Sequence, residues 1–94
     1  MALTNFGFIV TGDRFQQEQG TSHFRMKVVG VLKPEEGIEV AKQMVKDGVQ
    51  LIELCGGFGP VWTGKIIEAI GNKIPIGSVG YGPESIDSMH KLFS

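Results

Sequence analysis

The sequence predicts an α/β fold of about four strands, mostly parallel, joined by three helices in repeated strand–turn–helix units. Two observations favour this class. Short apolar segments alternate with longer ones whose apolar residues recur every three or four positions. The pattern Gly-aromatic-Gly-Pro also occurs twice, at residues 57–60 and 80–83, and a fainter copy without glycines ends at Pro34. Because 94 residues hold one core, we expect a single domain over residues 1–94.

The first third of the chain is expected to form two strands separated by a loop. Residues 6–10 are short and apolar, which indicates a strand whose direction the pattern leaves open. Residues 11–22 are polar, so we expect one long, mobile loop there. In the next strand, residues 24–31, Phe24, Met26 and Val28 face one way and Arg25 and Lys27 the other. That alternation indicates an edge strand with one wet face.

The next segment is expected to form a helix followed by a buried strand. Pro34 suits the first position of a helix. Gly48 is expected to end that helix, with Val49 folding back onto Met44. Residues 49–54 are nearly all apolar, which predicts a strand buried on both faces of a parallel sheet.

A second helix (residues 60–70), a fourth strand (residues 74–79) and a third helix that begins at Pro83 complete the expected fold. The third helix is expected to bury its apolar residues Ile86, Met89 and Phe93. Repeated right-handed crossovers would place the turns before the three helices along one edge of the sheet, at the carboxyl ends of the strands. In α/β proteins, ligands usually bind at this edge.

Charge and composition exclude several functional classes. Nine basic and ten acidic residues give a net charge of −1 without a basic run, so we expect no nucleic-acid partner. No apolar segment approaches the ~20 residues of a membrane span, and residues 1–10 lack the basic start of a signal peptide. One cysteine permits no internal disulfide, and His23 and His90 have no partner at metal-ligand spacing, so no metal site is expected. We therefore expect a cytoplasmic protein.

The composition also favours self-association. The chain has 14 glycines, about twice the usual share, and only 20% of its residues are charged. A sparsely charged, nearly neutral surface promotes contact between copies, so we expect a homo-oligomer. Its contact surface is expected to be either the face with Phe24, Met26 and Val28 or the outer side of the helix that holds Trp62.

The two glycine-rich turns form the candidate binding site. Their backbone N–H groups carry no shielding side chain, and each turn leads into a helix N-terminus, whose dipole favours an anion. These features predict that a small anionic or carbonyl-bearing molecule is bound by Gly56, Gly57, Phe58, Gly59, Gly80, Tyr81 and Gly82. The alternative is a structural or oligomerisation module, in which the glycines only permit tight turns and close packing.

Cys55 and Glu53 are the candidate catalytic residues of a second alternative, a small enzyme. Cys55 ends a strand just before a glycine turn, where the following helix N-terminus favours the nucleophilic thiolate. Glu53 lies two residues earlier, on the same side of the strand, and is a candidate general base. A lone cysteine is more often a small packing residue, so the residues leave open whether the chain is an enzyme. They identify no cofactor.

Two motifs carry a resemblance to a known family. The segments ELCGGFGP, residues 53–60, and VGYGPE, residues 79–84, resemble those of a group of small, mostly bacterial proteins known only as a domain of unknown function. The resemblance covers the chain from about residue 6 onwards and implies no activity and no catalytic residues. A looser likeness to the phosphate-binding turns of (β/α)8 barrels implies that two such chains could form a barrel-like pair.

Overall fold

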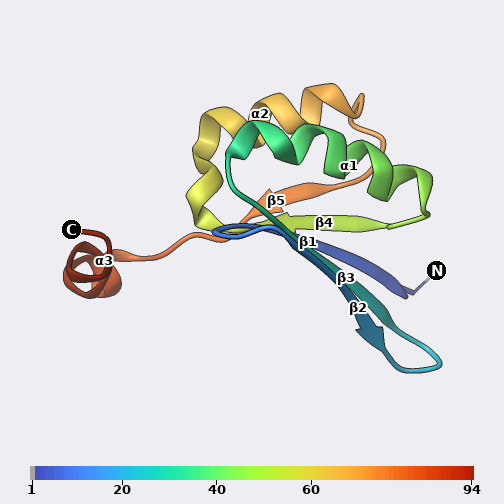
Figure 1. The fold of residues 1–94 in the computed structure, drawn as a ribbon, viewed down its shortest axis with the longest axis horizontal. Helices are drawn as coiled ribbons and strands as arrows, with labels where there is room; N and C mark the ends of the chain where they lie inside the picture. The colour runs from blue at the N-terminus through green and yellow to red at the C-terminus, as the bar shows by residue number, and fades with distance from the viewer. Residues whose placement is uncertain (1) are drawn as a thin grey trace.

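Five strands form one sheet in the order β2-β3-β1-β4-β5, in a computed structural model that describes residues 2–94 (Figure 1). β1 is parallel to both of its neighbours, β3 and β4, and β5 is parallel to β4. β2 is antiparallel to β3. The α/β class is therefore confirmed, with five strands in place of the expected four: β1 (Asn5–Thr11), β2 (Phe15–Gly20), β3 (Arg25–Val31), β4 (Leu51–Leu54) and β5 (Ile76–Ser78).

Three helices follow the parallel strands β3, β4 and β5, each after a 3-10 turn. They are α1 (Gly37–Lys46), α2 (Gly59–Ala69) and α3 (Ile86–Phe93). The expected helix starts at the three prolines are confirmed, because each proline lies at the beginning of a 3-10 turn or in the first turn of a helix. The end of α1 is confirmed as well: Gly48 has a φ of 86°, and the Val49 N–H donates to the Met44 carbonyl at 3.0 Å.

Helices α1 and α2 lie together on one face of the sheet (Figure 1). The connection from β3 to β4 passes over β1, and the connection from β4 to β5 continues in the same direction across the sheet. Crossovers of one hand that advance in one direction place their helices on the same face. No strand follows α3 within the described residues, so no crossover brings α3 back over the sheet.

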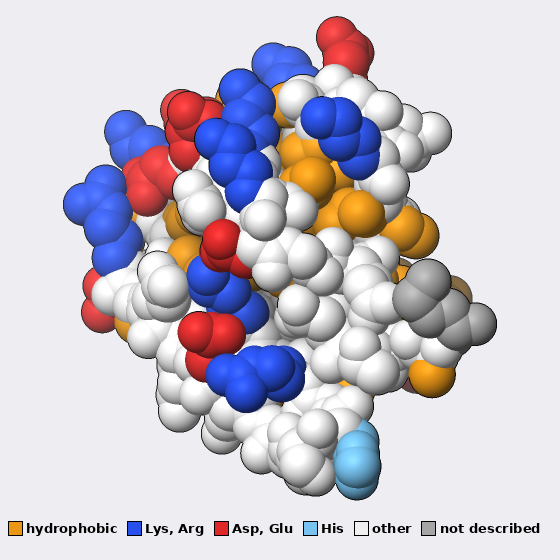
Figure 2. Space-filling model, turned by 90° about the vertical axis from the view of Figure 1, so that its right-hand side faces the viewer, with side chains coloured by type: hydrophobic (Ala, Val, Ile, Leu, Met, Phe, Trp, Pro, Cys, Tyr) orange, Lys and Arg blue, Asp and Glu red, His pale blue; other side chains and the backbone are white. Residues whose placement is uncertain are grey.

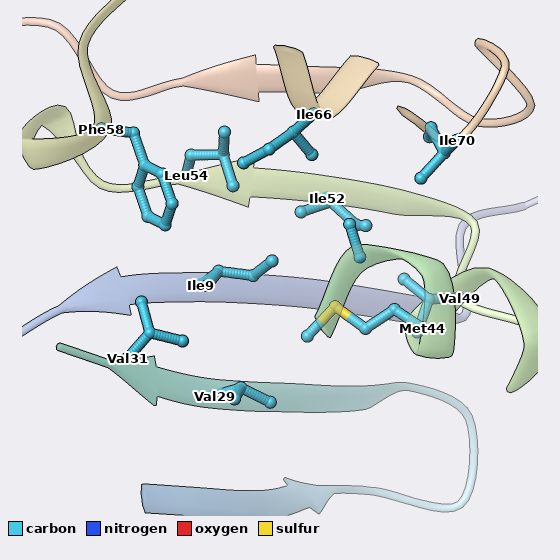
Figure 3. Close-up of a cluster of buried hydrophobic side chains, with 11 residues drawn as sticks. Ile9, Val29, Val31, Met44, Val49, Ile52, Leu54, Phe58, Ile66 and Ile70 are labelled. Atoms are coloured by element: carbon cyan, nitrogen blue, oxygen red, sulfur yellow. The ribbon is translucent and has the colours of Figure 1, made fainter. Parts of the chain in front are cut away.

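The hydrophobic core lies between the sheet and these two helices (Figure 3). Gly7 lets α1 approach β1, because a Cβ there would lie 2.7 Å from the Met44 sulfur. From the strands and helices, five large side chains are essentially inaccessible to solvent: Ile9, Met44, Ile52, Leu54 and Ile66. Helix α1 contributes Ala41 and Met44 to this core, and α2 contributes Ile66.

The expected loop over residues 11–22 is wrong, because residues 15–20 form β2. Every residue of β2 is exposed, so no apolar alternation marks it in the sequence. The strand is held by backbone pairing with β3, from Phe15 opposite Gly30 to Gly20 opposite Arg25. Backbone hydrogen bonds to β3 thus form a strand that the pattern of apolar residues in the sequence does not indicate.

The two expectations about sheet faces also need correction. β3 is not an edge strand, since it lies between β2 and β1. Its covered side carries Lys27, Val29 and Val31, whereas Met26 and Val28 lie on the side without helices. β4 is buried on one face only, because Glu53 is exposed.

The third helix does not bury the residues expected of it. Ile86 is 63% and Phe93 77% exposed, and only Met89 is half-buried. Figure 1 shows α3 beyond the carboxyl ends of the parallel strands, away from α1 and α2. Within residues 2–94, no helix combines the length and apolarity needed to span a bilayer.

Candidate pocket at the carboxyl edge of the sheet

A pocket of about 780 Å³ opens at the carboxyl edge of the sheet, between the glycine turns and α3. The end of β1, the turns after β4 and β5, and α3 all line it. The parallel direction of these strands explains the arrangement, because it brings their carboxyl ends to one edge. The lining residues are Val10, Thr11, Cys55, Gly56, Gly57, Gly59, Pro60, Ser78, Val79, Gly80, Tyr81, Gly82, Ser85, Ile86, Met89 and Phe93.

Most of the residues predicted to bind a ligand line this pocket. They are Gly56, Gly57, Gly59, Gly80, Tyr81 and Gly82, together with the candidate nucleophile Cys55. Two predicted residues lie elsewhere. Phe58 is 3% exposed and belongs to the core, and Glu53 is exposed on the sheet face without helices. The Glu53 carboxylate forms no hydrogen bond or ion pair with another described residue.

Thr11, which the sequence analysis did not select, holds the sulfur of Cys55. The Thr11 N–H donates to Cys55 Sγ at 3.2 Å, and the Thr11 hydroxyl oxygen lies 3.3 Å from the same sulfur. Thr11 ends β1, and Cys55 follows β4, the parallel neighbour of β1. The sequence could have indicated this contact only if β1 had been known to be parallel to β4, because the carboxyl ends of two parallel strands lie at the same edge of the sheet.

The turn that follows Cys55 needs glycine at two positions. A Cβ on Gly57 would collide with the Thr11 hydroxyl oxygen and would lie 3.5 Å from the Cys55 sulfur. Gly59 has a φ of 71°, which favours glycine, at the start of α2. Because these glycines have no side chains, the backbone of the turn itself lines the pocket.

No charged side chain lines the carboxyl-edge pocket. Its walls combine apolar groups of Val10, Val79, Ile86, Met89 and Phe93 with four hydroxyl groups, those of Thr11, Ser78, Tyr81 and Ser85. Figure 2 shows the opposite, amino edge, where basic and acidic side chains lie next to one another. The two edges of the sheet therefore differ in chemistry, and the uncharged one carries the glycine turns.

A second depression, of about 720 Å³, lies between α1 and the end of α2. Its rim carries charges of both signs, from Glu39, Lys42, Lys46, Glu68 and Lys73. Lys42 already pairs with Glu39 at 3.6 Å. Because charges of both signs lie side by side in solvent there, the surface attracts neither anions nor cations strongly. In residues 2–94, no group of three or more His, Cys, Asp or Glu side chains could hold a metal ion.

One comparison with known proteins finds a match. The sequence model described as "Family of unknown function (DUF6506)" matches residues 4–94 of the chain. No curated protein and no solved structure matches. The expected resemblance to an uncharacterised family is thereby confirmed, and it assigns no activity to the pocket.

Proposed function

We propose that this chain, which belongs to the DUF6506 family of unknown function, binds a small carbonyl-bearing molecule in the carboxyl-edge pocket. One observation carries the proposal: both glycine-rich turns, the sulfur of Cys55 and the apolar residues of α3 line one pocket of about 780 Å³. Pockets of this size, mostly apolar with a few polar groups, are typical of small-molecule sites.

The chemistry of the walls favours a carbonyl group over a strongly charged anion. An anion such as phosphate would lose its hydration in a pocket without a cationic side chain. The N-terminus of α2, at Gly59, would offset only part of that cost. A carbonyl oxygen needs only hydrogen-bond donors, which the hydroxyl groups of Thr11, Ser78 and Tyr81 supply.

The proposal is tested by searching for a retained ligand and then by measuring affinity. Native mass spectrometry of gently purified protein is expected to show added mass that disappears on denaturation. Ligand-observed NMR with a panel of ketones, amides, carboxylates and phosphates then identifies the class that binds. Binding of none of these classes, together with no added mass, would contradict the proposal.

A matched pair of variants locates the binding site. Tyr81→Ala removes a ring and a hydroxyl group from the pocket, and we expect the dissociation constant to rise about tenfold or more. Leu32→Ala is the control, because Leu32 is an exposed residue of the turn after β3, at the same edge but outside the pocket. Equal loss of affinity in both variants would place the ligand elsewhere.

The second candidate function is an enzyme with Cys55 as nucleophile; Glu53, the predicted assisting base, lies outside the pocket. The observation in its favour is the N–H of Thr11 directed at Cys55 Sγ, at 3.2 Å, inside the pocket. Addition of the Cys55 thiol to a carbonyl carbon forms a C–S bond and moves the π-electron pair of the carbonyl to oxygen, and the thiol proton passes to that oxygen through a hydroxyl group of the pocket or water.

Electrophilic carbonyl probes separate this candidate from simple binding. We expect a covalent mass increase that Cys55→Ala abolishes. If Glu53 assists, Glu53→Gln slows labelling; because Glu53 lies outside the pocket, unchanged labelling would leave Cys55 acting without it. An unlabelled wild-type thiol would rule out the enzyme and leave the binding proposal standing.

A further inference from the structure

The sheet face opposite α1 and α2 is apolar and carries no helix. Side chains on this bare face alternate with those of the core: Gly7 and Ile9 of β1 face the helices, so Phe6, Phe8 and Val10 face away. The register places residues of β3 and β4 beside them, with Met26 and Leu51 opposite Phe6 and Val28 opposite Phe8.

Aromatic rings extend the bare face at its rim. Phe24 and Phe6 stack, with ring centroids 6.4 Å apart. Phe24 is nonetheless 38% and Phe15 45% exposed. Among the residues of β1, β3 and β4 on this face, Glu53 alone is charged. Helix α3 leaves more apolar surface open, since Leu92 is 73% and Phe93 77% exposed.

The total exposed surface is larger than that of a typical folded monomer of this mass. The chain exposes 6269 Å², whereas a folded monomer of 10.2 kDa exposes roughly 5,300 Å². The excess of about 950 Å² is close to the ~800 Å² that one partner buries in a standard protein–protein interface. The radius of gyration of 13.8 Å likewise exceeds the roughly 12.4 Å expected for a compact domain of this length.

We propose that the bare face packs against the bare face of a second copy of the chain, in a two-fold symmetric homodimer. Such an interface sets the same patch against itself, which an apolar surface with one charged residue tolerates. A strongly charged partner would find nothing on this face to complement. The proposal does not depend on a ligand, since its observations concern β1, β3 and β4, although Val10 of the bare face also lines the pocket.

The oligomeric state tests the proposal directly. Light scattering coupled to size exclusion is expected to give twice 10.2 kDa at micromolar concentration. A mass of 10.2 kDa for the wild type would overturn the proposal. If the bare face of such a monomer were protected from solvent, α3 would be folded back over it. If it were unprotected, the face would be a surface for a different protein.

Two variants with the same chemical change identify the surface. Val28→Glu places a carboxylate at the centre of the bare face of each copy, and we expect the dimer dissociation constant to rise at least ~100-fold. Val61→Glu is the control, because Val61 is 66% exposed on α2, the other surface considered for self-association. Loss of the dimer in Val61→Glu with retention in Val28→Glu would overturn the proposed surface.

A milder variant guards against misfolding. Met26→Gln keeps the length of a half-buried side chain while adding an amide to the bare face. We expect it to weaken the dimer and to keep the circular dichroism spectrum of the wild type. Should Val28→Glu unfold, a dimer of unchanged affinity in Met26→Gln would itself contradict the proposal.

Discussion

At the scale of single residues, the close contact between Gly57 and Thr11 controls the geometry of Cys55. The Thr11 N–H and hydroxyl group both contact the Cys55 sulfur, at 3.2 and 3.3 Å. A Cβ on Gly57 would occupy the space of the hydroxyl oxygen. Any side chain at this position therefore moves Thr11 and changes the wall of the pocket.

Replacing Gly57 by alanine is expected to destabilise the protein. The added methyl group forces the Thr11 side chain to shift, which costs roughly 1–3 kcal/mol of unfolding free energy, measured by urea denaturation. Gly64→Ala is the matched control, because no atom lies within 4 Å of its Cβ position in α2. There alanine should stabilise the helix by roughly 0.5–1 kcal/mol. Equal effects at the two sites would show that the Thr11 contact is unimportant.

Part of the site could be predicted from single residues. The glycine turns and Cys55 stand out because their residue types are unusual for a buried strand and its end. Thr11 does not stand out, because threonine is common at the end of a strand. Its role depends on its contact with Cys55, which follows the neighbouring strand β4. Phe58 misled the interpretation: an aromatic residue between two glycines suggests a ligand wall, but its ring fills the core beneath the turn.

At the scale of elements, an ion pair connects β3 to the end of α1. Lys27 Nζ lies 2.9 Å from Asp47 Oδ2, and the Gln43 side chain donates to the other carboxylate oxygen. The hydrogen bonds from Lys27 and then Gln43 hold the pKa of Asp47 below its usual value of 3.8. The lysine stem runs along the covered face of the sheet, with 13% of its side chain exposed.

This contact predicts the direction of a pH dependence. Because the folded state lowers the carboxyl pKa, the stabilisation is present above the usual value of 3.8 and is lost as pH falls through the lower folded value. We expect Asp47→Asn to lower unfolding free energy near neutral pH and to flatten its decline in acid. An unchanged decline in Asp47→Asn would contradict the assignment.

Hydrogen exchange is expected to rank the elements by their pairing. β1 is paired on both sides and lies at the centre of the sheet, so its amides should exchange only through global unfolding. β2 is a fully exposed edge strand, and its outer amides should exchange roughly 100-fold faster or more. Comparable exchange rates in β1 and β2, measured by NMR, would show that β2 unfolds together with the core of the sheet.

The helices were easier to predict than β2 because their signals are local. Pro34, Pro60 and Pro83 mark the starts, and Gly48 with Val49 marks an end, all within a few residues of one another. β2 has no such signal, since its sequence is polar and its hydrogen-bonding partner, β3, is a separate segment. Element boundaries set by tertiary pairing are not readable from composition.

At the scale of the whole molecule, the bare face is the surface of the proposed dimer. β1 is apolar on both sides, with Ile9 towards the helices and Phe8 away from them. Residues 49–54 are nearly all apolar in the same way, which is why the sequence predicts a strand buried on both faces there. The crossovers cover only one face, and α3 lies beyond the sheet edge (Figure 1).

The proposed self-association through this face would make thermal stability depend on protein concentration. We expect the wild-type melting temperature to rise over a ~100-fold range of protein concentration, because association stabilises the folded chain by mass action. In Val28→Glu the melting temperature should be lower and independent of concentration. Differential scanning calorimetry measures both, and a wild-type value that does not move with concentration would indicate a monomeric chain.

Val10 belongs to two surfaces at once. It lies on the bare face of β1 and also lines the carboxyl-edge pocket. A ligand that changes the packing of this side chain would therefore alter the affinity of one copy for another in the proposed dimer. By thermodynamic reciprocity, association alters ligand affinity by the same factor. The pocket would then respond to the amount of protein present, so that abundance itself acts as an allosteric effector.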